Sequence, residues 1–146
     1  MDRVLSAIDR GRDSALEGLK AFLRIPSVST HPHHRDDVKD CADFLADEMR
    51  RIGLREVETI TTTGHPIVYG EWMDAPGQPT VLFYGHYDVQ PAEPFELWKS
   101  EPFDPTLRGG DLFARGATDD KGQVWLHLKA MEAHLSQTGR LPVNVK

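Results

Sequence analysis

Apolar residues recur every three or four positions in three stretches of the chain, which is the spacing of one helix face. The first stretch covers residues 2–24, the second begins at Asp36 and the third near Lys121. The apolar positions of these stretches are, in order, Val4, Leu5, Ile8, Leu16, Leu19, Phe22 and Leu23; Val38, Cys41, Leu45, Met49 and Ile52; and Val124, Trp125, Leu128, Met131 and Leu135. Pro26, Gly53 and Gly139 stand where helices should end. The pattern predicts three helices.

Shorter apolar runs between the helices indicate strands. Residues 54–61 and 66–72 are bounded by turns rich in Gly and Pro. Thr80–Tyr84, TVLFY, is apolar without alternation and predicts a central strand covered on both faces, and residues 141–146 begin a further strand. Together with the helices, this order predicts an α/β fold, a mixed β-sheet flanked by helices.

Residues 90–111 are rich in Pro, Gly and aromatic side chains. We predict no regular structure there, apart from a short extended piece at Asp111–Ala114.

Composition narrows the class of protein. The 146 residues correspond to one domain, with 39% hydrophobic and 27% charged residues. A net charge of -6 argues against partners that are nucleic acids or membrane surfaces, since both select clustered Lys and Arg. The N-terminus has no apolar core typical of a secretory signal, and the single Cys41 cannot form an internal disulfide. These features predict a cytoplasmic protein.

The most informative polar pair follows the TVLFY run, in the sequence GHYD. His86 and Asp88 are two positions apart, so on an extended chain they project to the same side. In open α/β sheets, ligand sites lie at the carboxyl ends of strands. A neutral imidazole binds zinc, and a carboxylate on its other nitrogen fixes the tautomer and orientation of the ring. The spacing therefore indicates a metal site.

Asp119 and Asp120 lie immediately before the third predicted helix. Carboxylates are favoured at a helix N-terminus, so a capping role explains them without any chemistry. Alternatively, one carboxylate bridges two divalent cations, as in two-metal hydrolases. Local spacing leaves both interpretations open.

A longer stretch carries a family resemblance. Residues 85–123, GHYDVQPAEPFELWKSEPFDPTLRGGDLFARGATDDKGQ, resemble the core signature of the zinc-dependent exopeptidase superfamily. That superfamily includes carnosinase-type dipeptidases, aminoacylases, acetylornithine deacetylase and succinyl-diaminopimelate desuccinylase. Residues 22–30, FLRIPSVST, resemble its first passage from helix to loop, and the loop with Trp98, Phe103 and Pro105 is most similar to the dipeptidase branch.

The resemblance implies a role for each matching residue. His86 corresponds to a metal ligand, Asp88 to the catalytic aspartate that orients it, and Asp119 to the aspartate that bridges two zinc ions. Asp120 is expected beside the site, joined to Asp119 by a cis peptide bond. Cobalt or manganese would suit the same nitrogen and oxygen ligands.

The resemblance also implies a hydrolase that cleaves peptide or amide bonds with a metal-activated water, acting on dipeptides or N-acyl amino acids. The glutamate that shuttles the proton, the remaining ligands and the lid domain that dimerises the parent protein are expected after Lys146. We therefore expect residues 1–146 to be the N-terminal portion of a metallopeptidase catalytic domain, inactive alone. The alternatives are a non-catalytic metal-binding or interaction module, or a truncated product without a function of its own.

Two further side chains leave alternatives open. Trp98 either packs the loop over the sheet, which we favour, or lines the mouth of a substrate site. Arg115 either pairs with a nearby acid or stabilises the loop that carries Asp119.

Overall fold

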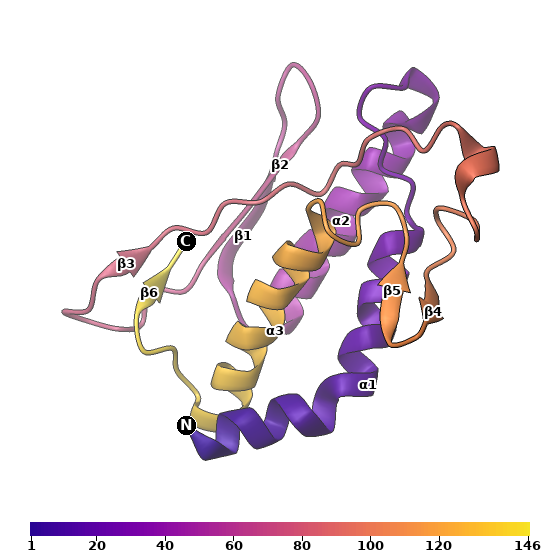
Figure 1. Ribbon diagram of the computed structural model, residues 1–146. Helices are drawn as coiled ribbons and strands as arrows, with labels where there is room; N and C mark the ends of the chain where they lie inside the picture. The colour runs from indigo at the N-terminus through magenta and orange to yellow at the C-terminus, as the bar shows by residue number, and fades with distance from the viewer.

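The three predicted helices are confirmed. The computed structural model describes residues 1–146, the whole chain. The helices are α1 (Asp2–Arg24), α2 (Arg35–Arg51) and α3 (Lys121–Thr138), and a single 3-10 turn, η1 (Pro32–His34), precedes α2 (Figure 1). Gly53 and Gly139 follow α2 and α3 with φ of 100° and 68°, the left-handed conformation that ends helices most readily at glycine.

Four short strands form two separate pairs. β1 (Arg55–Ile60) and β2 (Ile67–Glu71) are antiparallel, whereas β3 (Thr80–Val81) and β6 (Asn144–Val145) are parallel. Trp72, directly after β2, forms an isolated antiparallel bridge with Val145, so one bridge connects the two pairs. The α/β fold class is confirmed.

The prediction of a central buried strand at Thr80–Tyr84 is wrong. Only its first two residues pair, and the side chains of Leu82 and Tyr84 are 74% and 88% exposed. The reason is that the partner strand, β6, has only two residues. Beyond Val81, a single hydrogen bond continues the pairing, from the amide of Phe83 to the carbonyl of Lys146 at 2.8 Å.

A groove takes the place of further strand pairing. It has a volume of about 660 Å³ and lies between β2 and residues 82–88, with α2 and α3 contributing to its walls. Most of its lining is apolar, for example Val68, Phe83 and Val124. Its polar lining includes His86 and Asp88, the residues of the predicted site.

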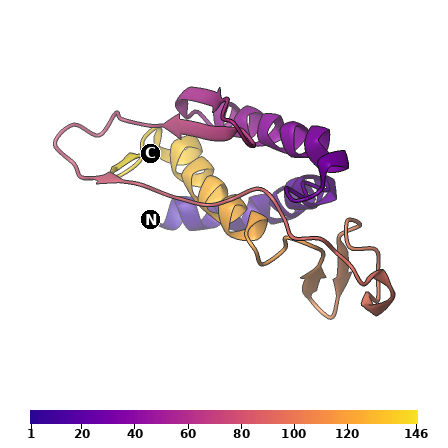
Figure 2. The ribbon, with the colours of Figure 1, turned by 90° about the horizontal axis from the view of Figure 1, so that it is seen from above.

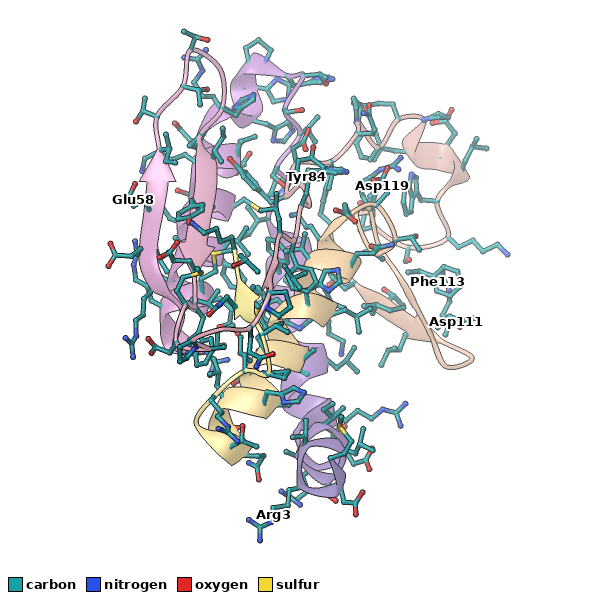
Figure 3. All side chains as sticks on the ribbon, turned by 90° about the vertical axis from the view of Figure 1, so that its left-hand side faces the viewer. Arg3, Glu58, Tyr84, Asp111, Phe113 and Asp119 are labelled. Carbon is teal, nitrogen blue, oxygen red and sulfur yellow. The ribbon has the colours of Figure 1, made fainter.

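The prediction that residues 90–111 lack regular structure is also wrong, whereas the short extended piece predicted at Asp111–Ala114 is confirmed. They include a 3-10 turn, η2 (Phe95–Leu97), and strand β4 (Thr106–Arg108), which pairs antiparallel with β5 (Asp111–Phe113). Gly109 and Gly110 join β4 to β5 with φ of 62° and 96°, so the two-residue turn requires positive φ at both positions. This hairpin projects to one side of the molecule in Figure 3, where Asp111 and Phe113 are labelled.

The helices form layers on the sheet. α2 packs against β1 and β2, and α1 packs against α3, which lies between α1 and α2 when the molecule is seen from above (Figure 2). The ring of Phe22 stacks on Phe44 with centroids 5.4 Å apart and lies 6.0 Å from Trp125. The core between the layers comprises Phe22, Cys41, Leu45, Ile52, Leu54, Trp72, Ala75, Trp125, Leu128, Met131, Leu141 and Val145. None of the helices has the length and apolar character needed to cross a bilayer.

Candidate metal centre

His86 and Asp88 lie on an extended segment, and their side chains meet as predicted. Nδ1 of His86 is 2.9 Å from Oδ1 of Asp88 and 3.1 Å from the Asp88 carbonyl oxygen. The segment is held from behind by Ser27, whose carbonyl accepts the amide of Val89 and whose hydroxyl donates to the carbonyl of Tyr87. The Oδ1 atom and the carbonyl oxygen of Asp88 both face Nδ1, and oxygen atoms of these kinds accept hydrogen bonds. They therefore favour a proton on Nδ1 and leave the Nε2 lone pair available for a ligand.

Asp119 reaches the same imidazole from the loop before α3. Its Oδ1 atom lies 2.9 Å from Nε2 of His86, although 33 positions separate the two residues. Figure 3 labels Asp119 at the end of the molecule where that loop enters α3. The peptide bond from Asp119 to Asp120 is cis, which confirms the prediction. The fold thus brings together the three residues predicted to form the site.

Asp120 lies beside the site, as expected. Its Oδ2 atom accepts the main-chain amide of His86 at 3.1 Å, so it is tied to the segment that carries the imidazole. Asp120 is the N-cap residue of α3, but its side chain makes no capping hydrogen bond. Capping therefore does not explain this aspartate pair. A Cβ atom at Gly85 would lie 3.0 Å from Asp120 Oδ2 and 2.6 Å from Val124 Cγ2, which explains the glycine before His86.

The electrostatics of His86 follow from these contacts. Burial alone would lower its pKa, but the hydrogen bonds to Asp88, together with the bond to Asp119, raise the pKa above the usual range of histidine. The side chains of His86 and Asp119 are 40% and 77% exposed, so solvent and solutes reach the pair. Burial raises the pKa of the neighbouring Tyr87 to about 12, and its hydroxyl donates to the carbonyl of Pro66.

Sequence reasoning missed the lysine that fixes the loop of Asp119. Lys121 is fully buried, and its ammonium group donates to the carbonyls of Phe22 at 2.9 Å and Ile25 at 2.7 Å. These carbonyls belong to the end of α1, where a cation is favoured by the helix dipole. Burial lowers the pKa of Lys121. The only signal in the sequence was its position directly after the two aspartates.

Ser29 and His65 were also missed. The Ser29 hydroxyl donates to Oδ2 of Asp88 at 2.5 Å, and Nε2 of His65 lies 2.8 Å from the Ser29 carbonyl oxygen. The sequence indicates only loop or turn for both segments, because short polar residues beside proline are typical of turns. No local pattern identifies a contact between residues that are 59 positions apart.

The donor set fits a zinc ion in type. An imidazole nitrogen with a carboxylate on the opposite ring nitrogen, and a second carboxylate 2.9 Å away, are typical of catalytic zinc sites. In number it is incomplete, since zinc in proteins takes at least three side-chain ligands. No group of three or more His, Cys, Asp or Glu side chains in the chain is arranged to hold a metal ion. His86 and Asp119 therefore supply two of the donors that a zinc ion would need.

The structure also answers the open questions about neighbouring residues. The indole nitrogen of Trp98 donates to the Ala92 carbonyl, which supports the packing role. Arg115 makes no ion pair; it donates to the carbonyl of Pro91 and lies 5.3 Å from the centre of the Trp98 ring, so it stabilises the loop.

Glu132, the acidic residue of α3, bonds Arg51 and Lys129 and is not at the site.

The chain is similar to known metallopeptidases. Residues 82–146 match the model of Peptidase family M20/M25/M40. The chain is 36% identical to the Cys-Gly metallodipeptidase dug1 of Schizosaccharomyces pombe over 99% of its own length and 33% of that protein. It is 42% identical to the succinyl-diaminopimelate desuccinylase of Bordetella avium over 88% of its length and 33% of that protein.

A solved structure supports the same relationship. The crystal structure of human carnosine dipeptidase 1 superposes with a TM-score of 0.91 and 32% identity, over 99% of this chain and 33% of that one. The chain spans about a third of the length of the relatives it matches.

Proposed function

We propose that residues 1–146 form the N-terminal portion of the catalytic domain of a dinuclear zinc-dependent dipeptidase. This proposal is supported by the match of residues 82–146 to the model of Peptidase family M20/M25/M40, and by the similarity of 99% of the chain to a metallodipeptidase and to carnosine dipeptidase 1. One observation supports this proposal above the others. His86, Asp88 and Asp119 come from two separate segments, and their nitrogen and oxygen atoms lie 2.9 Å apart on both sides of one imidazole ring.

Each residue has a distinct role. His86 would hold one metal ion through Nε2, and Asp88 keeps a proton on Nδ1 and fixes the plane of the ring. Asp119, with two carboxylate oxygens and an exposed side chain, would supply the carboxylate shared by the two ions. When bound, the zinc ions supply Lewis acidity, which polarises an amide carbonyl and activates water. Cobalt or manganese would suit the same donors.

The substrate class follows from the relatives. A Cys-Gly dipeptidase and a succinyl-diaminopimelate desuccinylase are named for substrates in which an amide bond joins two small polar groups. We propose that the whole protein hydrolyses such a bond in a dipeptide or an N-acyl amino acid.

The chain alone should bind zinc weakly and turn over little substrate, because it supplies two of the donors that a zinc ion needs. The test is a panel of Cys-Gly, β-Ala-His and N-succinyl amino acids incubated with the purified chain and Zn²⁺, Co²⁺ or Mn²⁺. We expect no hydrolysis above the metal-only blank. Turnover that is abolished by a chelator would contradict inactivity of the isolated chain.

The site assignment is tested in a protein with the length of the relatives. Asp119→Ala and His86→Ala should each abolish tight zinc binding, measured by metal content after dialysis, as well as dipeptide hydrolysis. Asp111→Ala, at the exposed first position of β5, removes a carboxylate away from the site and serves as the matched control. Hydrolysis by Asp119→Ala near the rate of the control would refute the assignment.

A second candidate is a non-catalytic metal-binding or interaction module, since the two donors of this chain do not make a complete zinc site. A truncated product without a function of its own is the third. The reading frame of the transcript after Lys146 separates them: a continuing frame that encodes a strand followed by paired glutamates supports the enzyme, and a stop codon supports the other two.

A further inference from the structure

Both carboxylate oxygens of Asp88 are engaged, each by a different side chain. Oδ1 faces Nδ1 of His86 at 2.9 Å, and Oδ2 accepts the hydroxyl hydrogen of Ser29 at 2.5 Å. A carboxylate held at one oxygen turns about its own side-chain bonds, whereas one held at both oxygens has a fixed plane. The Ser29 hydroxyl therefore limits how Asp88 meets the imidazole.

Ser29 is itself held from two directions. Val28 forms a parallel bridge with Val89, so the main chain beside Ser29 runs along the segment that carries His86 and Asp88. On the other side, Nε2 of His65, from the turn between β1 and β2, lies 2.8 Å from the Ser29 carbonyl oxygen and donates to it. The hydroxyl is thus presented by a backbone that two separate elements fix in place.

These residues form one continuous path of polar contacts across the site. The path runs from His65 through Ser29 to Asp88, then through the ring of His86 to Asp119. Its members belong to the β1–β2 turn, the loop after α1, the segment after β3 and the loop before α3. The orientation of the imidazole is therefore coupled to contacts outside the metal ligands.

We propose that Ser29 is a positioning residue of the metal centre, which acts through Asp88 to keep the His86 proton on Nδ1 and Nε2 free for a metal ion. The part that concerns the metal rests on the proposed function, whereas the part that concerns the tautomer does not. His65 supports Ser29 from behind by fixing its carbonyl group.

The first test reads the tautomer of His86 directly. Long-range ¹H–¹⁵N spectra of the ¹⁵N-labelled chain, recorded at a pH where the imidazole is neutral, distinguish a proton on Nδ1 from one on Nε2. We expect the wild-type ring to carry the proton on Nδ1. In Ser29→Ala, Asp88 is free to turn away, so the fraction of rings with the proton on Nε2 should increase severalfold. An unchanged ratio would overturn the proposal.

The matched control is Ser27→Ala. Ser27 lies on the same stretch of chain and donates its hydroxyl to the Tyr87 carbonyl, without touching Asp88. The two variants lose one hydrogen bond each, so a merely structural effect predicts the same spectrum for both. We expect the tautomer to change only in Ser29→Ala.

A second pair of variants separates the hydroxyl from the shape of the side chain. Ser29→Thr keeps the hydroxyl, and Ser29→Val replaces it with a methyl group at nearly the same volume. We expect the wild-type tautomer in Ser29→Thr and the altered ratio in Ser29→Val. This comparison also decides the question if Ser29→Ala does not fold, and identical ratios in the two variants would contradict the proposal.

Zinc binding gives a readout that does not depend on activity. Zn²⁺ is titrated into the same samples while the His86 ring signals are monitored. The dissociation constant should be about tenfold higher in Ser29→Ala, which is at the lower end of the loss expected when a group that orients a metal ligand is removed. If the wild-type chain binds Zn²⁺ too weakly to titrate, as its two donors would lead us to expect, the tautomer decides the role of Ser29, and the proposed function is tested separately by the variants of the longer protein. If wild type and Ser29→Ala bind equally, the positioning role is refuted while the metal site remains.

Discussion

The ammonium group of Lys121 donates to the carbonyl oxygen of Ile25 at 2.7 Å, across 96 positions of the chain. A second bond, at 2.9 Å, joins it to the carbonyl of Phe22. The first residue of α3 therefore satisfies carbonyls that α1 leaves without partners at its end. Since Asp119 lies two positions before Lys121, the end of α1 fixes the loop of the candidate metal centre.

Replacing Lys121 with methionine should destabilise the chain. Met fills a similar volume but leaves two buried carbonyls without donors, and we expect the free energy of unfolding to fall by about 2–3 kcal/mol. Urea unfolding followed by circular dichroism measures the change. Lys99→Met is the control, because Lys99 is exposed; it should stay within about 0.5 kcal/mol of wild type. Equal midpoints for the two variants would show that the carbonyl contacts contribute little.

The helices could be predicted because their signals are local. The apolar spacing along α2 and the glycines after α2 and α3 act within a few residues, and they gave the correct ends. The Thr80–Tyr84 strand failed because burial depends on neighbours. An apolar run shows that a segment is suited to burial, but other elements must supply the residues that bury it. Here β6 pairs with only two residues of the run. The β4–β5 hairpin was missed although Gly109 and Gly110 carry a turn signal.

The same limit applies to the candidate site. Residues close together in the sequence were predicted, whereas contacts between distant residues were missed. His86 and Asp88 are two positions apart, so strand geometry alone placed them together. Asp119 was identified through family resemblance, because nothing local relates it to His86. Ser29 and Lys121 act through contacts across 59 and 96 or more positions, which no periodicity contains.

Glu48 should make stability depend on pH. It bonds Arg51 and Lys129, and although burial alone would raise its pKa, these cations lower the pKa below its usual range. A carboxyl group whose pKa is lower in the folded state than in the unfolded state stabilises the fold. This contribution is fully present at a pH above the pKa of the unfolded state, about 4.3, and it is lost as the pH falls through the pKa of the folded state.

Unfolding by urea between pH 7 and pH 3 tests this expectation. Glu48→Gln should lower the free energy of unfolding by about 1–2 kcal/mol at pH 7 and by less at pH 3, because protonation of Glu48 weakens the same interaction in wild type as the pH falls. Glu58→Gln, on the exposed face of β1 at the edge of the molecule in Figure 3, should show no such difference between the two pH values. A penalty for Glu48→Gln that is as large at pH 3 as at pH 7 would contradict the assignment.

Two glycines in helices should respond to alanine in opposite directions. A Cβ atom at Gly122, in the first turn of α3, would lie 2.1 Å from the main-chain oxygen of Ala117, which cannot move without displacing the loop that carries Asp119. Gly122→Ala should therefore cost at least about 2 kcal/mol. Gly11, within α1, has no atom within 4 Å of the same position, so Gly11→Ala should gain about 0.5–1 kcal/mol from helix propensity. Thermal unfolding of both variants measures the signs, and a stabilised Gly122→Ala would show that the loop adjusts freely.

The exposed segment after β3 should make the isolated chain self-associate. Leu82 and Tyr84 present large apolar surfaces beside main-chain groups that lack strand partners, a combination that favours pairing between molecules. In sedimentation velocity experiments on the 146-residue chain, the double variant Leu82→Thr with Tyr84→Thr should shift the distribution towards monomer. Leu97→Thr removes a leucine with 77% exposure from a 3-10 turn outside the strand, so it tests whether any exposed leucine has the same effect. If Leu97→Thr reduces association as much as the double variant, general surface hydrophobicity is responsible, and the unpaired strand segment is not the cause.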